Sequence, residues 1–281
     1  MFDNVGIIGV GLIGSSMALE IRNNNLAKSV IGFDNDQKSL DTALKHGIID
    51  GYGSLDELSI CDFVIVATPV SSICDILKMA FDKLKKGSIV IDVGSVKGAI
   101  VEKIKKDIKQ DIHYVPVHPI AGIEKFGVEA ARKGLFNNAY CIITPFEGIN
   151  EFAKKKVESF VKALGMRVEI MDADEHDWVF AYISHLPHII AYNLVGLIEE
   201  KNNEKFKFIG GGFRDFTRIA ASSEKMWSDI FLLNKKSVAE SIDEFIGHMN
   251  RLKEMIQKDD SEAVMHYLKR ARLFKESIDE R

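Results

Sequence analysis

The first half of the chain alternates between short apolar runs and longer stretches in which apolar residues recur at helical spacing. The runs cover residues 5–8, 30–33, 63–67, 88–93, 112–117, 140–145 and 166–171. Continuous apolar runs of this length are typical of strands covered on both faces, as in a parallel sheet. Regular alternation of such strands with helices predicts an α/β Rossmann-type fold, doubly wound around a mainly parallel sheet.

The strand pattern ends near residue 170, and the second half is helical throughout. One long helix is expected over residues 174–200. Toward the C-terminus apolar side chains recur every three or four positions, at Phe231, Ile242, Phe245, Ile246, Met249, Leu252, Met255 and Ile256. We therefore expect a doubly wound domain over residues 1–170 and an all-α domain over 171–281. A small bundle would leave part of this apolar surface exposed, so we expect a homodimer formed through the helical domain.

A glycine-rich turn joins the first strand to the first helix. Its sequence is Gly9-Val10-Gly11-Leu12-Ile13-Gly14. The first glycine permits a tight turn, the second lets the backbone approach a pyrophosphate, and the third lets the helix pack on the strand. The helix N-terminus presents N–H groups to the phosphates. This pattern predicts a dinucleotide site, and the alternative is a glycine set that serves helix packing alone.

An acidic residue, Asp34, closes the next strand, 20 positions after Gly14. Its carboxylate is suited to both ribose hydroxyls and would repel a 2′-phosphate, so we expect NAD rather than NADP as the cofactor. Thr68 and Pro69 follow the third strand and turn the chain over the same side of the sheet.

The most informative histidine, His118, stands at a strand end between Pro116 and Pro119. Proline cannot continue a sheet ladder, and ligands bind at strand ends in nucleotide-binding sheets. An imidazole there can accept a proton near neutral pH. Taken alone, His118 is also compatible with a core histidine bonded to the backbone.

Two further polar sites are compatible with either a functional or a structural role. Ser95 heads a helix after the strand at 88–93, where it either caps that helix or contacts a ligand. Ser184 and His188 are four positions apart on one helix face, and Pro187 beside them predicts a kink. A polar contact between helices is the alternative interpretation of this pair.

A glycine triplet at 210–212 precedes Asp215 and Arg218. Asp215 is a good helix N-cap, which would place Arg218 in the first turn. The helix dipole disfavours a cation there unless an anion binds it, and the guanidinium fork suits a carboxylate.

The composition of the chain argues against several classes of binding partner. The net charge is -4 with interspersed signs, which gives no reason to expect nucleic acid. The acidic run at 172–177 lacks the pattern of a calcium loop, so no metal is expected. We expect no membrane span, no signal peptide and, from three cysteines without a paired motif, a reducing cytoplasm.

The ordered set of motifs resembles the prephenate dehydrogenase family, which includes arogenate and cyclohexadienyl dehydrogenases. The resemblance covers nearly the whole chain. It rests on the turn at 9–14, Asp34, and the segments at 94–97, 118–122, 184–188 and 215–218. It implies NAD-dependent oxidative decarboxylation of prephenate in tyrosine biosynthesis, with arogenate as the alternative substrate, and a homodimer.

The resemblance also implies roles for single residues. His118 matches the base that accepts the proton of the ring hydroxyl, and Ser95 matches a serine that bonds the same hydroxyl. Arg218 matches the arginine that holds the ring carboxylate. The remaining matches line the substrate pocket, at Ser184 and His188, or its mouth, at Glu124 and Asp215. Ile123 departs from the family, where this position is often polar, and this affects recognition of the pyruvyl end.

Two rival functions fit parts of the sequence. A β-hydroxyacid dehydrogenase or imine reductase shares the layout, but it uses a lysine on the long helix or lacks the histidine after the last strands. A non-catalytic NAD sensor would have lost His118 or Arg218, and both are present.

Overall fold

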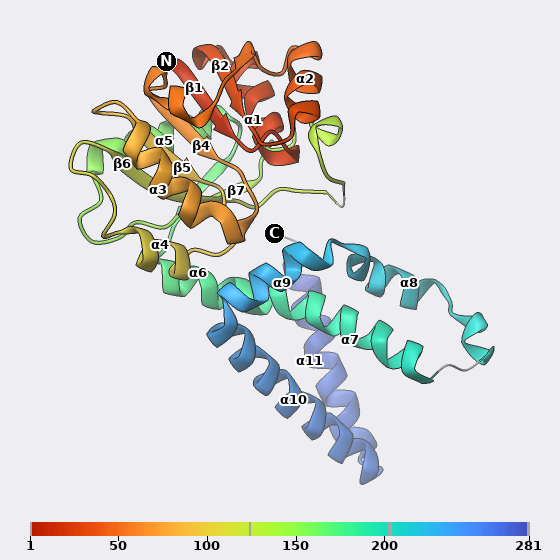
Figure 1. Ribbon diagram of the computed structural model, residues 1–281. Helices are drawn as coiled ribbons and strands as arrows, with labels where there is room; N and C mark the ends of the chain where they lie inside the picture. The colour runs from red at the N-terminus through yellow and green to blue at the C-terminus, as the bar shows by residue number, and fades with distance from the viewer. Residues whose placement is uncertain (1, 124, 202–203, 280–281) are drawn as a thin grey trace. The chain divides into compact units, whose positions relative to one another are not determined.

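The computed structural model describes residues 2–123, 125–201 and 204–279 (Figure 1). Its centre is one eight-stranded sheet of order β3-β2-β1-β4-β5-β6-β7-β8. The strands are β1 (Phe2–Ile8), β2 (Ala27–Phe33), β3 (Gly51–Tyr52), β4 (Phe63–Val66), β5 (Ile89–Asp92), β6 (His113–Pro119), β7 (Tyr140–Ile143) and β8 (Arg167–Ile170). This confirms the predicted fold class.

One neighbour pair breaks the parallel pattern, since β6 and β7 run antiparallel with His118 opposite Ile142. In the described residues of the connection between them, the short 3₁₀ turn η3 (Val128–Ala130) is the one helical element, whereas a parallel crossover normally carries a helix. The short strand β3 was not expected, because Gly51 and Tyr52 carry no apolar run.

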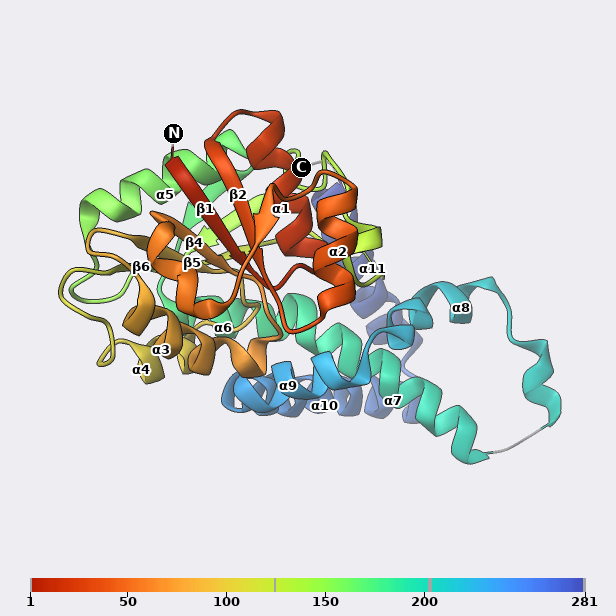
Figure 2. The same ribbon diagram turned by 45° about the horizontal axis from the view of Figure 1, so that its top comes forward.

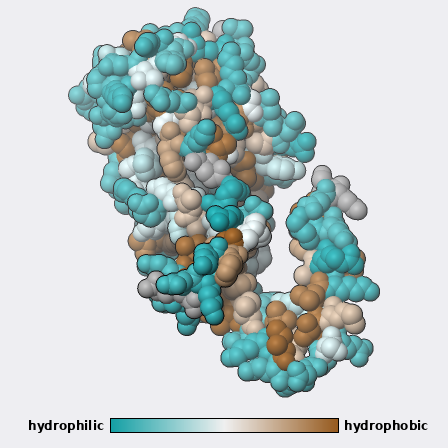
Figure 3. All heavy atoms as spheres, turned by 90° about the vertical axis from the view of Figure 1, so that its right-hand side faces the viewer, coloured by the Kyte–Doolittle hydropathy of each residue, from teal (hydrophilic) through white to brown (hydrophobic). Residues whose placement is uncertain are grey.

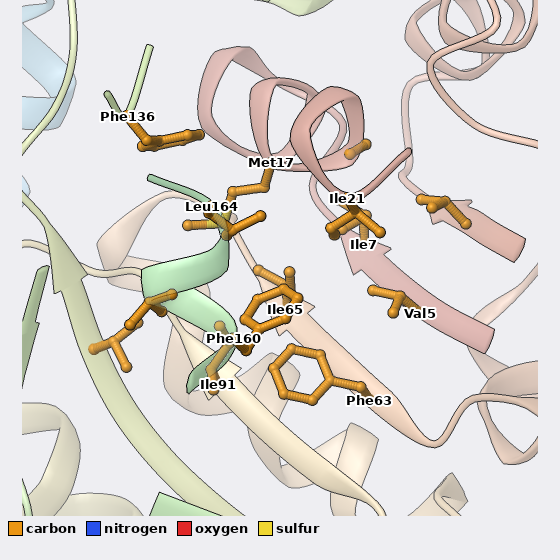
Figure 4. Close-up of a cluster of buried hydrophobic side chains, with 14 of the residues drawn as sticks. Val5, Ile7, Met17, Ile21, Phe63, Ile65, Ile91, Phe136, Phe160 and Leu164 are labelled. Carbon is orange, nitrogen blue, oxygen red and sulfur yellow. The ribbon is translucent and has the colours of Figure 1, made fainter. Parts of the chain in front are cut away.

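Helices cover both faces of the sheet (Figure 2). On one face α1 (Leu12–Asn23), α2 (Gln37–Lys45) and α5 (Glu151–Ala163) share a buried apolar cluster with the strands. Figure 4 shows its centre, where the rings of Phe63 and Phe160 pack together with centroids 4.6 Å apart. The other face carries η1 (Leu55–Ile60), η2 (Val70–Ser72), α3 (Ile73–Lys83) and α4 (Gly98–Ile104).

Helices also make up the described chain beyond residue 172. They are α6 (Ala173–Phe180), the π-helical turn η4 (Ala181–His185), α7 (Leu186–Lys201), η5 (Glu204–Phe208), α8 (Gly211–Thr217), η6 (Arg218–Ala221), α9 (Glu224–Leu233), α10 (Lys235–Gln257) and α11 (Ser261–Asp279). Trp227 and Ile230 of α9 join the apolar cluster that α3 and α4 cover.

The chain forms two compact units, Met1–Asn234 and Lys235–Arg281. The second unit is a hairpin of α10 and α11. The division of function at residue 170 remains a prediction, since α6 to α9 pack with the sheet in the first unit.

The π-helical turn η4 ends two residues before Pro187, in the region where the sequence predicted a kink. Proline has no N–H for the helix ladder, and a single π-turn absorbs such a defect without ending the helix.

No helix that could span a membrane was expected from the sequence, and the continuous helix across Pro187 corrects this expectation. The helix Ala173–Lys201 is long and apolar enough to cross a bilayer by length and composition alone. Pro187, His188 and Asn193 interrupt its apolar sequence but not its helical path. Core helices of globular proteins pass the same test, so the finding is weak evidence for a span.

Candidate active site

The glycine turn between β1 and α1 has the backbone geometry of a phosphate loop. Gly9 has φ +96°, and a Cβ there would lie 2.6 Å from the Ala67 carbonyl oxygen. A Cβ on Gly14 would lie 2.1 Å from the Gly9 carbonyl oxygen. Around Gly11, by contrast, no atom lies within 4 Å of the Cβ position, so the turn is open on the side where a phosphate would approach.

The carboxylate of Asp34 lies against the same turn. Its Oδ2 accepts a hydrogen bond of 2.7 Å from the N–H of Val10, and Oδ1 accepts one of 2.9 Å from the N–H of Asp36. These contacts fix the carboxylate at the end of β2 beside the mouth of the turn.

A cavity of roughly 600 Å³ opens in front of these residues. The predicted cofactor residues Gly9, Gly11, Asp34, Thr68 and Pro69 line it. The hydroxyl of Thr68 is buried without a hydrogen-bond partner in the described structure. A buried, unpaired hydroxyl in a cavity of this size fits a polar ligand, and the residues present suit a dinucleotide.

The other predicted members of the turn have a different position. Leu12 and Ile13 begin α1 and pack against the apolar cluster of that face. They contribute backbone N–H groups of the first helical turn, which have no partner within the helix. No acidic residue lies in that turn, as is appropriate where an anion binds.

His118 ends β6 and is paired with a second histidine. Its Nδ1 lies 2.8 Å from Nε2 of His176 on α6. The ring of Phe180 packs against both imidazoles, with centroid distances of 4.9 and 4.5 Å. His118 thus uses one ring nitrogen within the protein and remains half-buried.

The second histidine is bonded in turn to Asp177. His176 Nδ1 lies 2.8 Å from Asp177 Oδ1. The N–H groups of Lys97 and Gly98 each donate to this carboxylate at 2.8 Å. Asp177 therefore joins the start of α4 to the middle of α6.

A buried lysine lies beneath the histidines. Lys97 Nζ donates to the carbonyl oxygen of Val117 at 2.7 Å and pairs with Asp92, whose other oxygen accepts from the hydroxyl of Tyr114. Burial lowers the pKa of His118 well below 6.5, and electrostatic interactions with His176, Lys97 and His185 lower it further. Burial also lowers the pKa of His176, although the carboxylate of Asp177 opposes this shift.

Ser95 lies at the carboxyl end of β5, the strand beside β6. The helix that follows has Lys97 at its N-cap position, and its first N–H groups donate to the carboxylate of Asp177. Ser95 therefore does not cap α4, and this partly exposed residue follows β5 at the same edge of the sheet as His118.

Ser184 and His188 are joined through the helix backbone. His188 Nδ1 donates to the carbonyl oxygen of Ser184 at 2.9 Å. The His188 ring stacks on Trp227 of α9, with centroids 3.6 Å apart and an interplanar angle of 26°. His188 is thus held between α7 and α9.

The predicted position of Arg218 in its helix is wrong. Gly210 is extended and acts as the N-cap of α8, so Asp215 lies inside this helix and Arg218 follows its last residue. Glycine is tolerated at an N-cap, which lets the helix begin within the triplet. Arg218 is exposed at the C-terminal end, where the dipole favours a cation. Glu124 lies outside the described residues.

The structure adds residues that the sequence interpretation missed. His176, Asp177 and Lys97 are buried around His118, and Trp227 supports His188. Helical spacing offered one signal, because His176 lies four positions before Phe180 on the face that turns inward. No sequence signal indicated that His176 of α6 would contact His118 of β6, because 58 residues separate them.

The arrangement has a clear chemical capability. A neutral imidazole at the carboxyl end of the sheet, in a unit that also holds a nucleotide-sized cavity, can accept a proton from a bound alcohol. Among the described residues no group of three or more potential ligands is arranged to hold a metal ion.

Nearly the whole chain is similar to known proteins of one family. Residues 17–170 match the family "Prephenate dehydrogenase, nucleotide-binding domain", and residues 172–270 match "Prephenate dehydrogenase, dimerization domain". The prephenate dehydrogenase of Bacillus subtilis is 34% identical over 99% of this chain and 76% of its own length. The cyclohexadienyl dehydrogenase of Zymomonas mobilis is 32% identical over 96% of this chain and 94% of its own.

A solved structure agrees over its full length. Prephenate dehydrogenase from Aquifex aeolicus, in complex with hydroxyphenyl propionate and NAD+, superposes with a TM-score of 0.94 at 36% identity, covering 99% of both chains.

Proposed function

Since the chain belongs to the prephenate dehydrogenase family, we propose that it catalyses the NAD-dependent oxidative decarboxylation of prephenate to 4-hydroxyphenylpyruvate in tyrosine biosynthesis. The observation that carries this proposal is His118, a neutral imidazole with one nitrogen held by His176. Its location in the same unit as the cofactor cavity suits an alcohol oxidation. We also propose a cytoplasmic location, in keeping with three buried free thiols.

Within this reaction His118 is the general base. The glycine turn and Asp34 would hold NAD, which would supply the hydride acceptor for ring C4 of the substrate. His118 takes the proton of the 4-hydroxyl through Nε2, and the hydroxyl of Ser95 bonds the same oxygen. The ketone that forms is conjugated with the ring and accepts the electrons released when the ring carboxylate leaves as carbon dioxide. The ring then becomes aromatic, which makes the step irreversible.

The remaining residues bind and orient the substrate. Arg218 pairs with the ring carboxylate, for which its planar fork is suited. His188 and Ser184 line the side-chain end of the pocket, and Glu124 and Asp215 lie at its mouth. Arg218 must not bind the carboxylate too tightly, because that group departs and tight binding would stabilise the ground state.

The second candidate activity is oxidation of arogenate to tyrosine. Arogenate has the same ring end as prephenate, and one relative of this chain is a cyclohexadienyl dehydrogenase. Ile123 offers no polar side chain to the end where the two substrates differ. Initial rates of NADH formation with purified prephenate and arogenate, measured side by side, distinguish the two. We expect prephenate to give the higher kcat/KM, and a higher value for arogenate would reverse the assignment.

Asp34 should make the enzyme prefer NAD over NADP. A carboxylate beside a 2′-phosphate costs several kcal/mol, so we expect kcat/KM for NAD to exceed that for NADP by at least about 10²-fold. Asp34→Ala should reduce this ratio at least about tenfold. The exposed Asp41 of α2 offers a control, and Asp41→Ala should leave the ratio unchanged. Equal use of both cofactors by the unaltered enzyme would refute this role.

The low pKa of His118 should appear in the pH profile. Because burial lowers that pKa well below 6.5, the neutral base persists as the pH falls through 6.5. We expect kcat/KM for prephenate to stay level from neutral pH down past 6.5 and to fall only in more acidic buffer. A half-maximal point above pH 6.5 would contradict the lowered pKa.

We propose that the protein is a homodimer formed through its helical domain. The hairpin of α10 and α11 exposes apolar side chains, among them Leu268 at 55% and Phe274 at 66%. Apolar side chains appear as brown patches between teal polar ones in Figure 3. An apolar surface of this kind suits a partner subunit.

Light scattering during gel filtration tests the dimer. We expect a mass of twice 31.5 kDa for the unaltered chain. Leu268→Asp should shift the mass toward the monomer, since it places a charge in the proposed interface. Lys269→Asp alters an adjacent exposed polar position and should leave the mass unchanged. A monomer for the unaltered protein would refute the dimer.

A further inference from the structure

Asp177 holds three hydrogen-bond donors at once. Its Oδ1 lies 2.8 Å from both the N–H of Lys97 and Nδ1 of His176, and its Oδ2 accepts from the N–H of Gly98 at 2.8 Å. The two backbone N–H groups can only donate, so both carboxylate oxygens act as acceptors. The proton between Asp177 and His176 therefore resides on Nδ1 of His176.

The position of the proton on His176 determines the position of the proton on His118. A neutral His176 carries one ring proton, and with that proton on Nδ1 its Nε2 is an acceptor. His118 Nδ1 lies 2.8 Å from this Nε2, so it must carry the proton that they share. The Nε2 of His118 is then without a proton.

Charge in the surroundings supports the neutral form of His176. A doubly protonated His176 would donate from both nitrogens and would force the opposite tautomer on His118. The ammonium of Lys97 at the start of α4 disfavours a cation on His176, while Asp92 and Asp177 favour one. Burial of the ring decides against the cation, and the pKa of His176 is lowered.

We propose that His176 and Asp177 are positioning residues, which hold His118 in the Nδ1–H tautomer so that Nε2 is the free base toward substrate. This rests on the proposed role of His118 as the general base. A histidine side chain in water favours the opposite tautomer, in which Nε2 carries the proton and cannot accept another from an alcohol. The hydrogen bond to His176 also helps to fix the plane of the His118 ring. Phe180 contributes to this, because it packs on both imidazoles.

The base and its two positioning residues come from different parts of the fold. His118 comes from the sheet, whereas His176 and Asp177 come from the first helix after it. Asp177 is bonded in turn to the turn after β5 that contains Ser95. The helical segment thus orients the base in addition to supplying substrate contacts.

The tautomer can be observed directly in the unaltered enzyme. Long-range proton–nitrogen correlation spectra of protein labelled with ¹⁵N-histidine distinguish a protonated from a bare ring nitrogen, and His118→Asn identifies the His118 signals. We expect His118 to show a protonated Nδ1 and a bare Nε2. A protonated Nε2 on His118 at neutral pH would overturn the proposal.

Variants of His176 connect the tautomer to turnover. His176→Phe keeps a ring but removes the acceptor, and we expect kcat to fall about 10–100-fold, with KM for prephenate changed less than about threefold. The His118 proton should move toward Nε2. His176→Gln keeps an acceptor and should recover at least about fivefold of the lost kcat. His46→Gln, at the exposed end of α2, is the matched control and should leave kcat unchanged.

The outcomes separate the two claims. Retained kcat and an unshifted tautomer in His176→Phe would overturn the positioning role, as would equal losses in the Phe and Gln variants. If His176→Phe does not fold, as judged by its melting curve, the wild-type spectrum and the Gln variant decide the matter. An unaltered enzyme that oxidises neither substrate but shows the Nδ1–H signal would refute the proposed function and still support the positioning.

Discussion

Replacing His118 by asparagine should lower kcat for prephenate by about 10²–10⁴-fold. We expect KM to change less than about threefold, because the general base acts on a proton that moves only in the transition state. Asparagine retains a polar group of moderate size at the end of β6 but cannot accept the proton. Steady-state NADH formation over a range of prephenate concentrations measures both constants.

The matched control lies on the same strand. His113 begins β6 and His118 is near its end, so His113→Gln changes a histidine of the same element at the opposite edge of the sheet. We expect His113→Gln to keep the wild-type kcat. Turnover of His118→Asn within a few-fold of the unaltered enzyme would remove His118 as the base.

The second large effect is expected at Arg218. Arg218→Ala should raise KM for prephenate by about 30-fold or more, the lower end of the 2–5 kcal/mol that a lost charge pair costs when its partner is buried with the substrate. The lower end applies because Arg218 is exposed in the absence of substrate. Arg218→Lys should recover part of this loss, since it keeps the charge but not the planar fork.

Arg214 provides the control for this experiment. It lies four positions earlier on α8, is also exposed, and carries the same charge. Arg214→Ala should leave KM within about twofold of the unaltered value, whereas a general loss of positive charge would affect both variants alike. An unchanged KM in Arg218→Ala would exclude Arg218 from the substrate pocket.

The sheet could be predicted because its strands are buried on both faces. Runs such as Phe63–Val66 contain no polar residue, so their pattern is unambiguous. The edge strand Gly51–Tyr52 escaped prediction because two residues without apolar neighbours carry no periodic signal. The antiparallel pairing of β7 depends on the path of the preceding segment, which local sequence does not determine.

The site was predictable where its chemistry is local. The glycine turn and Asp34 act through adjacent backbone geometry, and both line one cavity. Arg218 was placed at the wrong helix end, because a glycine triplet is compatible with both a flexible link and a helix start. His176 and Asp177 were missed since their partners, His118 and Lys97, lie 58 and 80 residues away in the chain.

The most direct test of the proposed reaction is its stoichiometry. Purified enzyme is incubated with prephenate and NAD, and NADH, carbon dioxide and 4-hydroxyphenylpyruvate are measured in the same samples, with His118→Asn in parallel. We predict equal amounts of all three products from the unaltered enzyme, and their formation together slowed about 10²–10⁴-fold in the variant. NADH without matching carbon dioxide, or equal rates from both proteins, would contradict an oxidative decarboxylation that depends on His118.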